Sequence, residues 1–159
     1  VPADLALRYA KGNLDPITRS PGATFDKTVL KTIQAAHARG SKGVVSGGED
    51  YGDVNQIPAQ AALNTFNYKI TPQGIQVIDT FNFDKVHLNV GGAGVIPGVQ
   101  DTANRLVDIG DRTARALGFD PRDPNYGIKI NYIIPKSRLT KKQREQFYNE
   151  STPIVQHGY

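Results

Sequence analysis

The stretch that decides the fold is residues 64–83, NTFNYKITPQGIQVIDTFNF. Apolar and polar residues alternate on both sides of the sequence TPQG at 71–74, which is typical of a turn. A period of two is the pattern of a half-buried β-strand. The stretch therefore predicts an antiparallel β-hairpin.

Helices are predicted before the hairpin. Residues 3–11 have the spacing of a short helix. A clearer one runs from Asp26 to Arg39, with Asp26 as its N-cap and Gly40 as the left-handed residue that ends it. Residues 41–62 are rich in glycine and predict a loop.

Further elements are predicted after the hairpin. Residues 101–117 carry one apolar stripe and predict an amphipathic helix. Residues 126–134 alternate again and predict a third strand. Thr140 and Gln143 form a capping-box pair that opens a last helix. The whole predicts an α+β fold, a small antiparallel β-sheet (hairpin plus later strand) with amphipathic helices packed on it.

The composition bounds the class of protein. The chain has 159 residues, 38% hydrophobic and 21% charged, which predicts a single domain over 1–159. We expect an irregular N-terminal arm over 1–25 and a flexible tail over 150–159. The absence of Cys excludes disulfides, thiolate metal sites and Cys nucleophiles. Neither a membrane-spanning apolar run nor a signal peptide is visible. The chain also has no Met, so we expect a fragment or processed part of a larger protein.

The densest group of chemically active side chains follows the second hairpin strand. Asp79, Asp84 and His87 fall within nine residues. A carboxylate and an imidazole together can perform general acid–base catalysis or hold a divalent metal, with Asp79 as the metal ligand. The alternative interpretation is a set of polar residues at a strand end that hydrogen-bond a loop.

Two other groups predict structural roles. His37 lies on the apolar side of its helix, which predicts a partly buried packing residue. Glu49, Asp50 and Asp53 lack the spacing of a calcium loop, which favours solvated loop acids.

The net charge of +4 is concentrated near the C-terminus. Six cations and no acid lie between residues 124 and 144: Lys129, Lys136, Arg138, Lys141, Lys142 and Arg144. Such a stretch attracts phosphate, whether of nucleic acid, lipid headgroups or a pyrophosphate substrate. A solvated strand end and helix face is the alternative.

The order of these elements resembles the catalytic domain of the colicin M family of bacteriocins. The shared order is a helix ending in glycine, a hairpin whose second strand ends in Asp-x-aromatic-polar-Phe, an amphipathic helix ending in Leu-Gly, and a last strand. The matching stretches are Leu63–Asp84 and Thr102–Pro135. The same order resembles C-terminal segments of phage tail and internal virion proteins. The colicin M resemblance implies a metal-dependent phosphodiesterase that cuts a lipid-linked peptidoglycan precursor between lipid and pyrophosphate.

The chain departs from the colicin M motif, which reads Asp-x-Tyr-Asp followed shortly by His-Arg. Asp79 and His87 match, whereas Phe81 replaces Tyr, Asn82 replaces the second Asp, and Leu88 replaces Arg. Asn cannot take a proton as a carboxylate does, and loss of Arg removes a bidentate phosphate clamp. The resemblance therefore supports the fold more than the activity.

The first hypothesis is a virion-associated phage structural module, the C-terminal part of a tape-measure, tail or ejected internal virion protein. We expect a homo-oligomer among other virion or tail subunits. The basic stretch would contact those subunits, bacterial envelope lipid or DNA.

The alternative is a phosphodiesterase of colicin M type, a secreted toxin acting in the bacterial periplasm or a phage lytic activity. Asp79 would bind the metal or act as base, His87 would be the acid–base partner and Asp84 a second carboxylate. The basic stretch would hold the pyrophosphate, with magnesium or calcium as cofactor. A third hypothesis is a nucleic-acid-binding module that uses the basic stretch.

Overall fold

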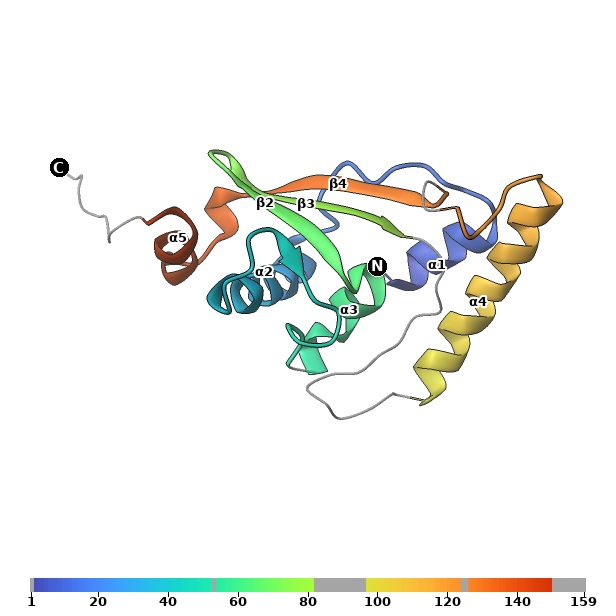
Figure 1. Ribbon diagram of the computed structural model, residues 1–159, viewed down its shortest axis with the longest axis horizontal. Coiled ribbons are helices and arrows are strands. Elements are labelled where there is room, and N and C mark those ends of the chain that lie inside the picture. Colours follow the sequence, from blue (N-terminus) through green and yellow to red (C-terminus); the bar gives the residue numbers. More distant parts are fainter. Residues whose placement is uncertain (1, 53, 82–96, 124–125, 150–159) are drawn as a thin grey trace.

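The computed structural model describes residues 2–52, 54–81, 97–123 and 126–149. The chain folds into two layers, a four-stranded antiparallel sheet and a set of α-helices (Figure 1). This confirms the predicted α+β class. Within the described residues, no helix combines the length and the apolar character that a membrane crossing requires.

The predicted hairpin forms the centre of the sheet. Strand β2 (Phe66–Thr71) pairs with β3 (Gly74–Phe81), and Thr71 faces Gly74 across the turn. The Thr71 hydroxyl donates a hydrogen bond of 2.8 Å to the Gly74 carbonyl oxygen and accepts one from the Gly74 N–H. A Cβ at Gly74 would lie 2.0 Å from the carbonyl oxygen of Ile134 on the next strand, so the turn requires glycine.

The outer strands complete the order β1-β2-β3-β4. Strand β4 (Ile128–Pro135) pairs with all of β3, and the two-residue β1 (Val44–Val45) pairs with β2. The N-terminal arm covers the outer edge of β4. There the Ile17 N–H donates to the Lys129 carbonyl oxygen at 2.8 Å, and the Ile17 carbonyl oxygen accepts from the Asn131 N–H at 2.9 Å. Pairing of this kind reduces the unsatisfied backbone groups at a sheet edge.

The helices occupy one face of the sheet and its two ends. They are α1 (Pro2–Ala10), α2 (Ala23–Ala38), η1 (Val54–Gln56), α3 (Ile57–Leu63), α4 (Pro97–Ala116), η2 (Lys136–Arg138) and α5 (Lys141–Tyr148). Helices α1, α2 and α3 lie on the same side of the sheet (Figure 1). Helix α4 packs against α1 at one end, and α5 lies at the other end, beside α2.

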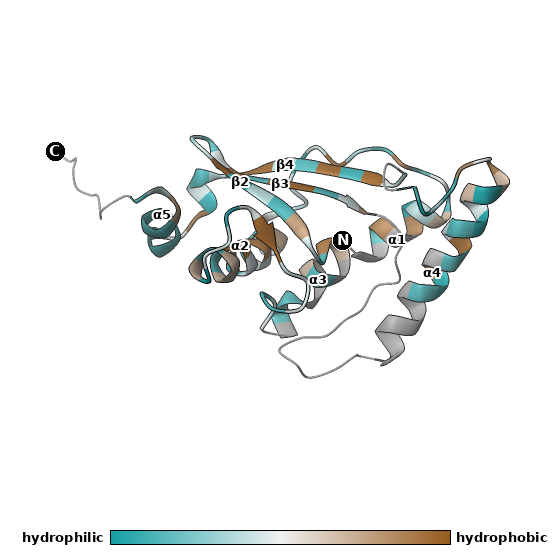
Figure 2. Ribbon diagram, viewed as in Figure 1, coloured by the Kyte–Doolittle hydropathy of each residue, from teal (hydrophilic) through white to brown (hydrophobic). Residues whose placement is uncertain are grey.

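The core lies between these two layers. Buried and exposed positions alternate along β4 and the first part of β2, and Figure 2 shows apolar and polar residues interspersed along the strands. The sheet contributes the buried residues Phe66, Tyr68, Ile75, Val77, Ile128, Ile130 and Ile134, and α2 contributes Val29, Leu30 and Ile33. Burying one such side chain fully stabilises the fold by about 1.5–3 kcal/mol.

The helix predicted over 3–11 is confirmed as α1, so the arm predicted over 1–25 is irregular between α1 and α2. Two predictions of local structure are wrong. The predicted loop over 41–62 contains β1, η1 and all but the last residue of α3. Helix α2 begins at Ala23 with Gly22 as N-cap, so Asp26 lies inside the first turn. The other end of α2 is as predicted, because Gly40 has a φ of 94° and its N–H donates to the His37 carbonyl oxygen.

The helix predicted over 101–117 is longer at its start and shorter at its end, since α4 spans Pro97–Ala116 and Leu117 is 61% exposed. Its contact with α1 is close. A Cβ at Gly110 would lie 2.2 Å from a ring carbon of Tyr9. The Tyr9 hydroxyl donates to Asp111 Oδ1 at 2.6 Å. Gly110, the small residue in the apolar stripe of α4, therefore allows α1 and α4 to pack closely.

The capping box predicted at the start of the last helix, α5, is confirmed. The Thr140 hydroxyl accepts from the Gln143 N–H at 3.1 Å, and the Gln143 side chain accepts from the Thr140 N–H at 2.9 Å. The prediction for His37 is also confirmed. Its imidazole is half-buried and makes an edge contact with the Phe147 ring, with 5.3 Å between centroids.

Two buried carboxylates are held by arginines. Asp50 is 3% exposed and accepts from Arg39 Nε at 2.8 Å and Nη2 at 2.9 Å. It is therefore not the solvated loop acid that the sequence predicted. Asp26 is fully buried, and its Oδ2 accepts from the Ser20 hydroxyl and from Arg138 Nη1. The Arg39–Asp50 pair therefore connects the end of α2 to the loop that follows it, and the Arg138–Asp26 pair connects α2 to η2.

Candidate functional site

Asp79 lies near the end of β3, on the face that the helices cover. It shares that face with the buried residues Val77 and Phe81, and it pairs in register with Ile130 of β4. Its side chain is half-buried. Because side chains two residues apart on a strand share a face, Asp79 is partly buried together with these neighbours.

Burial raises the pKa of Asp79 to about 8, although a hydrogen bond from the Thr80 N–H opposes the shift. In the part of the chain that the structure describes, no cation forms an ion pair with this carboxyl. Burial also raises the pKa of the nearby Tyr51 hydroxyl, and the negative charge on Asp79 adds to that effect. At neutral pH, Asp79 is therefore mostly protonated and can donate a proton, as a general acid does.

The other two predicted catalytic residues lie outside the described residues. Asp84 and His87 belong to the segment 82–96, which begins directly after β3. Elsewhere, in the described parts of the chain, no group of three or more His, Asp or Glu side chains could hold a metal ion. Of the predicted metal and catalytic residues, the structure places Asp79 alone.

The six predicted phosphate-binding cations lie far from this carboxyl, with one exception. Lys129 faces Thr80 across the β3–β4 pair, so it lies at the same end of the sheet but on the outer face. Lys136 comes six residues after Ile130, the register partner of Asp79. At ~3.3 Å per strand residue, that separates it from Asp79 by about 20 Å. The remaining four cations lie beyond Lys136, in η2 and α5.

Several of these cations already have partners. Arg138 pairs with the buried Asp26 and donates to the Ser20 hydroxyl at 2.9 Å. Arg144 Nη1 donates to the Leu139 carbonyl oxygen at 2.8 Å. Lys136 Nζ lies 4.3 Å from the centre of the Tyr148 ring, a cation–π contact.

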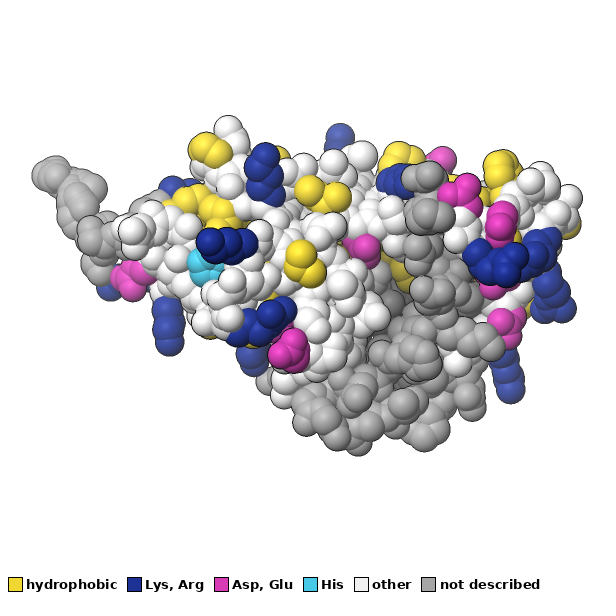
Figure 3. Space-filling model, viewed as in Figure 1, with side chains coloured by type: hydrophobic (Ala, Val, Ile, Leu, Met, Phe, Trp, Pro, Cys, Tyr) yellow, Lys and Arg dark blue, Asp and Glu magenta, His cyan; other side chains and the backbone are white. Residues whose placement is uncertain are grey.

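Lys141 and Lys142 are exposed at the start of α5. In Figure 3, Lys and Arg side chains gather over the end formed by α2 and α5 and also over α4. Acidic side chains lie among them at both places, with the larger group over α4. The α2–α5 end therefore carries the less balanced positive charge.

The sequence interpretation missed two polar residues that line a cavity. Arg19 falls within the predicted irregular arm and Tyr132 within the predicted third strand, and both line the cavity. Their proximity depends on the bridge between Ile17 and Ile130, which joins segments more than 100 residues apart. Local periodicity carries no signal for such a contact.

Comparison with known proteins finds no matching family, no matching curated protein and no matching solved structure.

Proposed function

We propose that this domain is a virion-associated phage module, part of a tail, tape-measure or internal virion protein, and that it binds a polyanionic partner through its α2–α5 end. The proposal rests on the resemblance of the element order and on one observation. The predicted cations and the predicted catalytic carboxyl lie at opposite ends of the sheet, Lys129 excepted.

This separation bears directly on the phosphodiesterase alternative. A cation that stabilises charge on a transferring phosphoryl group must contact its oxygens, within about 3 Å. The cations from Lys136 onward lie about 20 Å or more along the sheet from Asp79. At that distance they do not assist a proton transfer at Asp79, which supports a separate role for them in binding a partner.

The test of the virion assignment has two parts. Mass spectrometry of purified particles should detect peptides of this chain, and the purified chain should form a stable multimer in analytical ultracentrifugation. A monomeric chain that is absent from particles contradicts the proposal.

The polyanion contact is tested by salt titration. Duplex DNA and anionic lipid vesicles serve as separate probes, because each presents phosphate. The salt slope is the slope of the logarithm of the DNA-binding constant against the logarithm of the salt concentration. Exchange of both Lys141 and Lys142 for Gln should reduce its magnitude by about 0.9 for each phosphate that the variant no longer neutralises. A matched pair, Arg105→Gln with Arg112→Gln on α4, should leave the slope unchanged. Binding to neither probe contradicts this part.

A second candidate function is favoured by Asp79 itself. A desolvated carboxyl without a cation partner lowers the stability of the fold when it ionises, and groups of this kind are concentrated at functional sites. In a colicin M-type phosphodiesterase, Asp79 would act as the acid, with Asp84 and His87 supplied by the segment that follows β3.

This candidate is tested with the lipid-linked peptidoglycan precursor and magnesium. The assay detects release of the pyrophosphoryl sugar by the intact chain. Asp79→Asn, Asp84→Asn and His87→Ala should each abolish release, whereas Asp15→Asn, at an exposed loop position, should retain it. No turnover, or turnover that survives Asp79→Asn, excludes the enzyme.

A further inference from the structure

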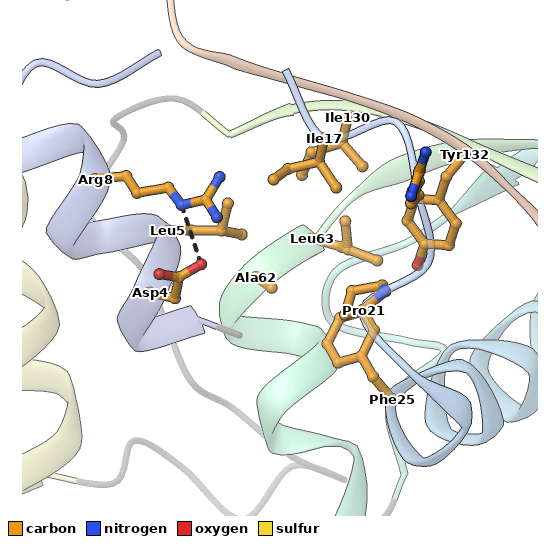
Figure 4. A pocket seen from close by; sticks show the side chains of 11 residues that line it. Asp4, Leu5, Arg8, Ile17, Pro21, Phe25, Ala62, Leu63, Ile130 and Tyr132 are labelled. Carbon is orange, nitrogen blue, oxygen red and sulfur yellow. Dashed lines mark ion pairs between the residues drawn. The ribbon is translucent and has the colours of Figure 1, made fainter. Parts of the chain in front are cut away.

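A cavity of about 340 Å³ opens between α1, the arm, the start of α2, α3 and the inner face of β4 (Figure 4). Its volume lies within the range of small-molecule sites. At ~30 Å³ per heavy atom, as in liquid water, it accommodates on the order of a dozen heavy atoms. It is separate from Asp79, which does not line it.

The inner walls of the cavity are apolar and shielded from solvent. Figure 4 shows side chains from different elements pointing into this one space. The walls include Leu5, Phe25, Ala62, Leu63 and Ile130, each at most 9% exposed. Such walls favour the hydrocarbon part of a ligand.

One polar group in the wall has no partner. Tyr132 is 3% exposed, and within the described residues its hydroxyl makes no hydrogen bond. A buried hydroxyl without a partner lowers stability, because it has given up its bonds to water. Burial, with the charge on nearby Asp26, raises the pKa of Tyr132. The hydroxyl therefore keeps its proton and is available to donate it to an acceptor on a ligand.

The charged groups that line the cavity carry one net positive charge. Arg8 Nε lies 3.2 Å from Asp4 Oδ2, so these two side chains compensate each other (Figure 4). Arg19 also lines the cavity, is exposed, and forms no ion pair with any residue that the structure describes. A guanidinium in this position attracts a carboxylate.

We propose that this cavity binds a small amphipathic monocarboxylate with an apolar body of about ten carbons. The body fills the space between α1, α3 and β4. The Tyr132 hydroxyl donates a hydrogen bond to the acid group, and Arg19 pairs with its charge. The ligand thereby gives the buried Tyr132 hydroxyl a hydrogen-bond partner and the Arg19 guanidinium a counter-ion.

The experiment uses decanoate as the probe, with decan-1-ol as the uncharged comparison, and measures binding to the whole chain by isothermal titration calorimetry. The wild-type chain should bind decanoate several-fold more tightly than decan-1-ol. Arg19→Gln should weaken decanoate binding about two- to fivefold and leave decan-1-ol unchanged. Arg112→Gln, an exposed arginine on α4, is the matched control and should bind both as the wild type does.

Two variants test the interior. Tyr132→Phe should weaken decanoate binding about two- to tenfold, the value of one hydrogen bond. It should also raise or keep the Tm of the unliganded chain, because it removes a hydroxyl without a partner. Ala62→Leu adds three carbons within the cavity and should abolish binding while the Tm is retained.

The proposal is overturned if about 1 mM decanoate gives no heat with the wild-type chain. It is also overturned if a folded Ala62→Leu chain binds decanoate as the wild type does, or if decanoate and decan-1-ol bind equally in the wild type and in Arg19→Gln.

Discussion

The carboxyl groups at the two ends of the sheet have opposite environments. Beside η2 and α5, Asp26 is fully buried, and Arg138 and a serine hydroxyl contact it. Toward the other end, Asp79 is half-buried, has no described cation partner, and has a pKa raised to about 8. A carboxylate paired with a guanidinium connects elements of the fold, whereas an unpaired and desolvated one exchanges a proton near neutral pH. The first arrangement stabilises the fold, whereas the second leaves a carboxyl group that can gain or lose a proton near neutral pH.

The largest expected effect is the pH dependence caused by Asp79. Its folded-state pKa of about 8 lies above the ordinary value of 3.8, so between these two pH values the folded chain binds more protons than the unfolded chain. The proton on Asp79 stabilises the fold to its full extent below about pH 4, and this stabilisation is lost as the pH rises to about 8. The loss is on the order of 5 kcal/mol at most, and water that reaches the half-exposed carboxyl reduces it.

Urea unfolding at several pH values between 5 and 8 measures this loss. In Asp79→Asn the decline should be absent, because the amide does not titrate. Asp15→Asn is the control and should keep the wild-type decline. An unchanged decline in Asp79→Asn contradicts the assigned pKa.

Next in size is the effect of breaking the Arg138–Asp26 pair. Arg138→Gln leaves a fully buried carboxylate without its cation, which should lower the free energy of unfolding by about 3 kcal/mol at pH 7. Lys142→Gln removes an exposed cation of the same stretch and should change it by less than about 0.5 kcal/mol.

The double variant Asp26→Asn with Arg138→Gln completes this test by urea denaturation. It should recover part of the loss, since no uncompensated charge remains in the core. Equal effects of Arg138→Gln and Lys142→Gln would mean that the ion pair does not stabilise the fold.

The elements that could be predicted from the sequence are those whose signals are local. The hairpin follows from a period of two and a turn of four residues, and the capping box follows from two side chains three residues apart. Helix α3 has no such signal, because it is seven residues long, carries a proline in its first turn and follows a glycine-rich stretch. Its helical state depends on packing against α1, α2 and β3.

The role of charged residues was harder to predict, because it depends on partners distant in the chain. Asp26 has the residue type of an N-cap but lies inside the first turn of α2, and Arg138, 112 residues away, contacts its carboxylate. Arg138 was counted among phosphate-binding cations for the same reason, since composition records the charge and not its partner. The site around Asp79 was predicted as a group of three, of which Asp84 and His87 lie outside the described residues.

The smallest expected effect concerns how the α2–α5 end is built. Thr140→Ala removes the hydroxyl that accepts the Gln143 N–H at the start of α5, which should cost about 1 kcal/mol of stability. Thr140→Ser keeps an accepting oxygen and should cost less. Because neither change alters the charge, any weakening of DNA binding in Thr140→Ala must come from fraying of the turn that carries Lys141 and Lys142. Urea denaturation and the salt titration together make the distinction: a lowered stability with an unchanged salt slope would show that the two lysines act by charge alone, without an ordered helix beneath them.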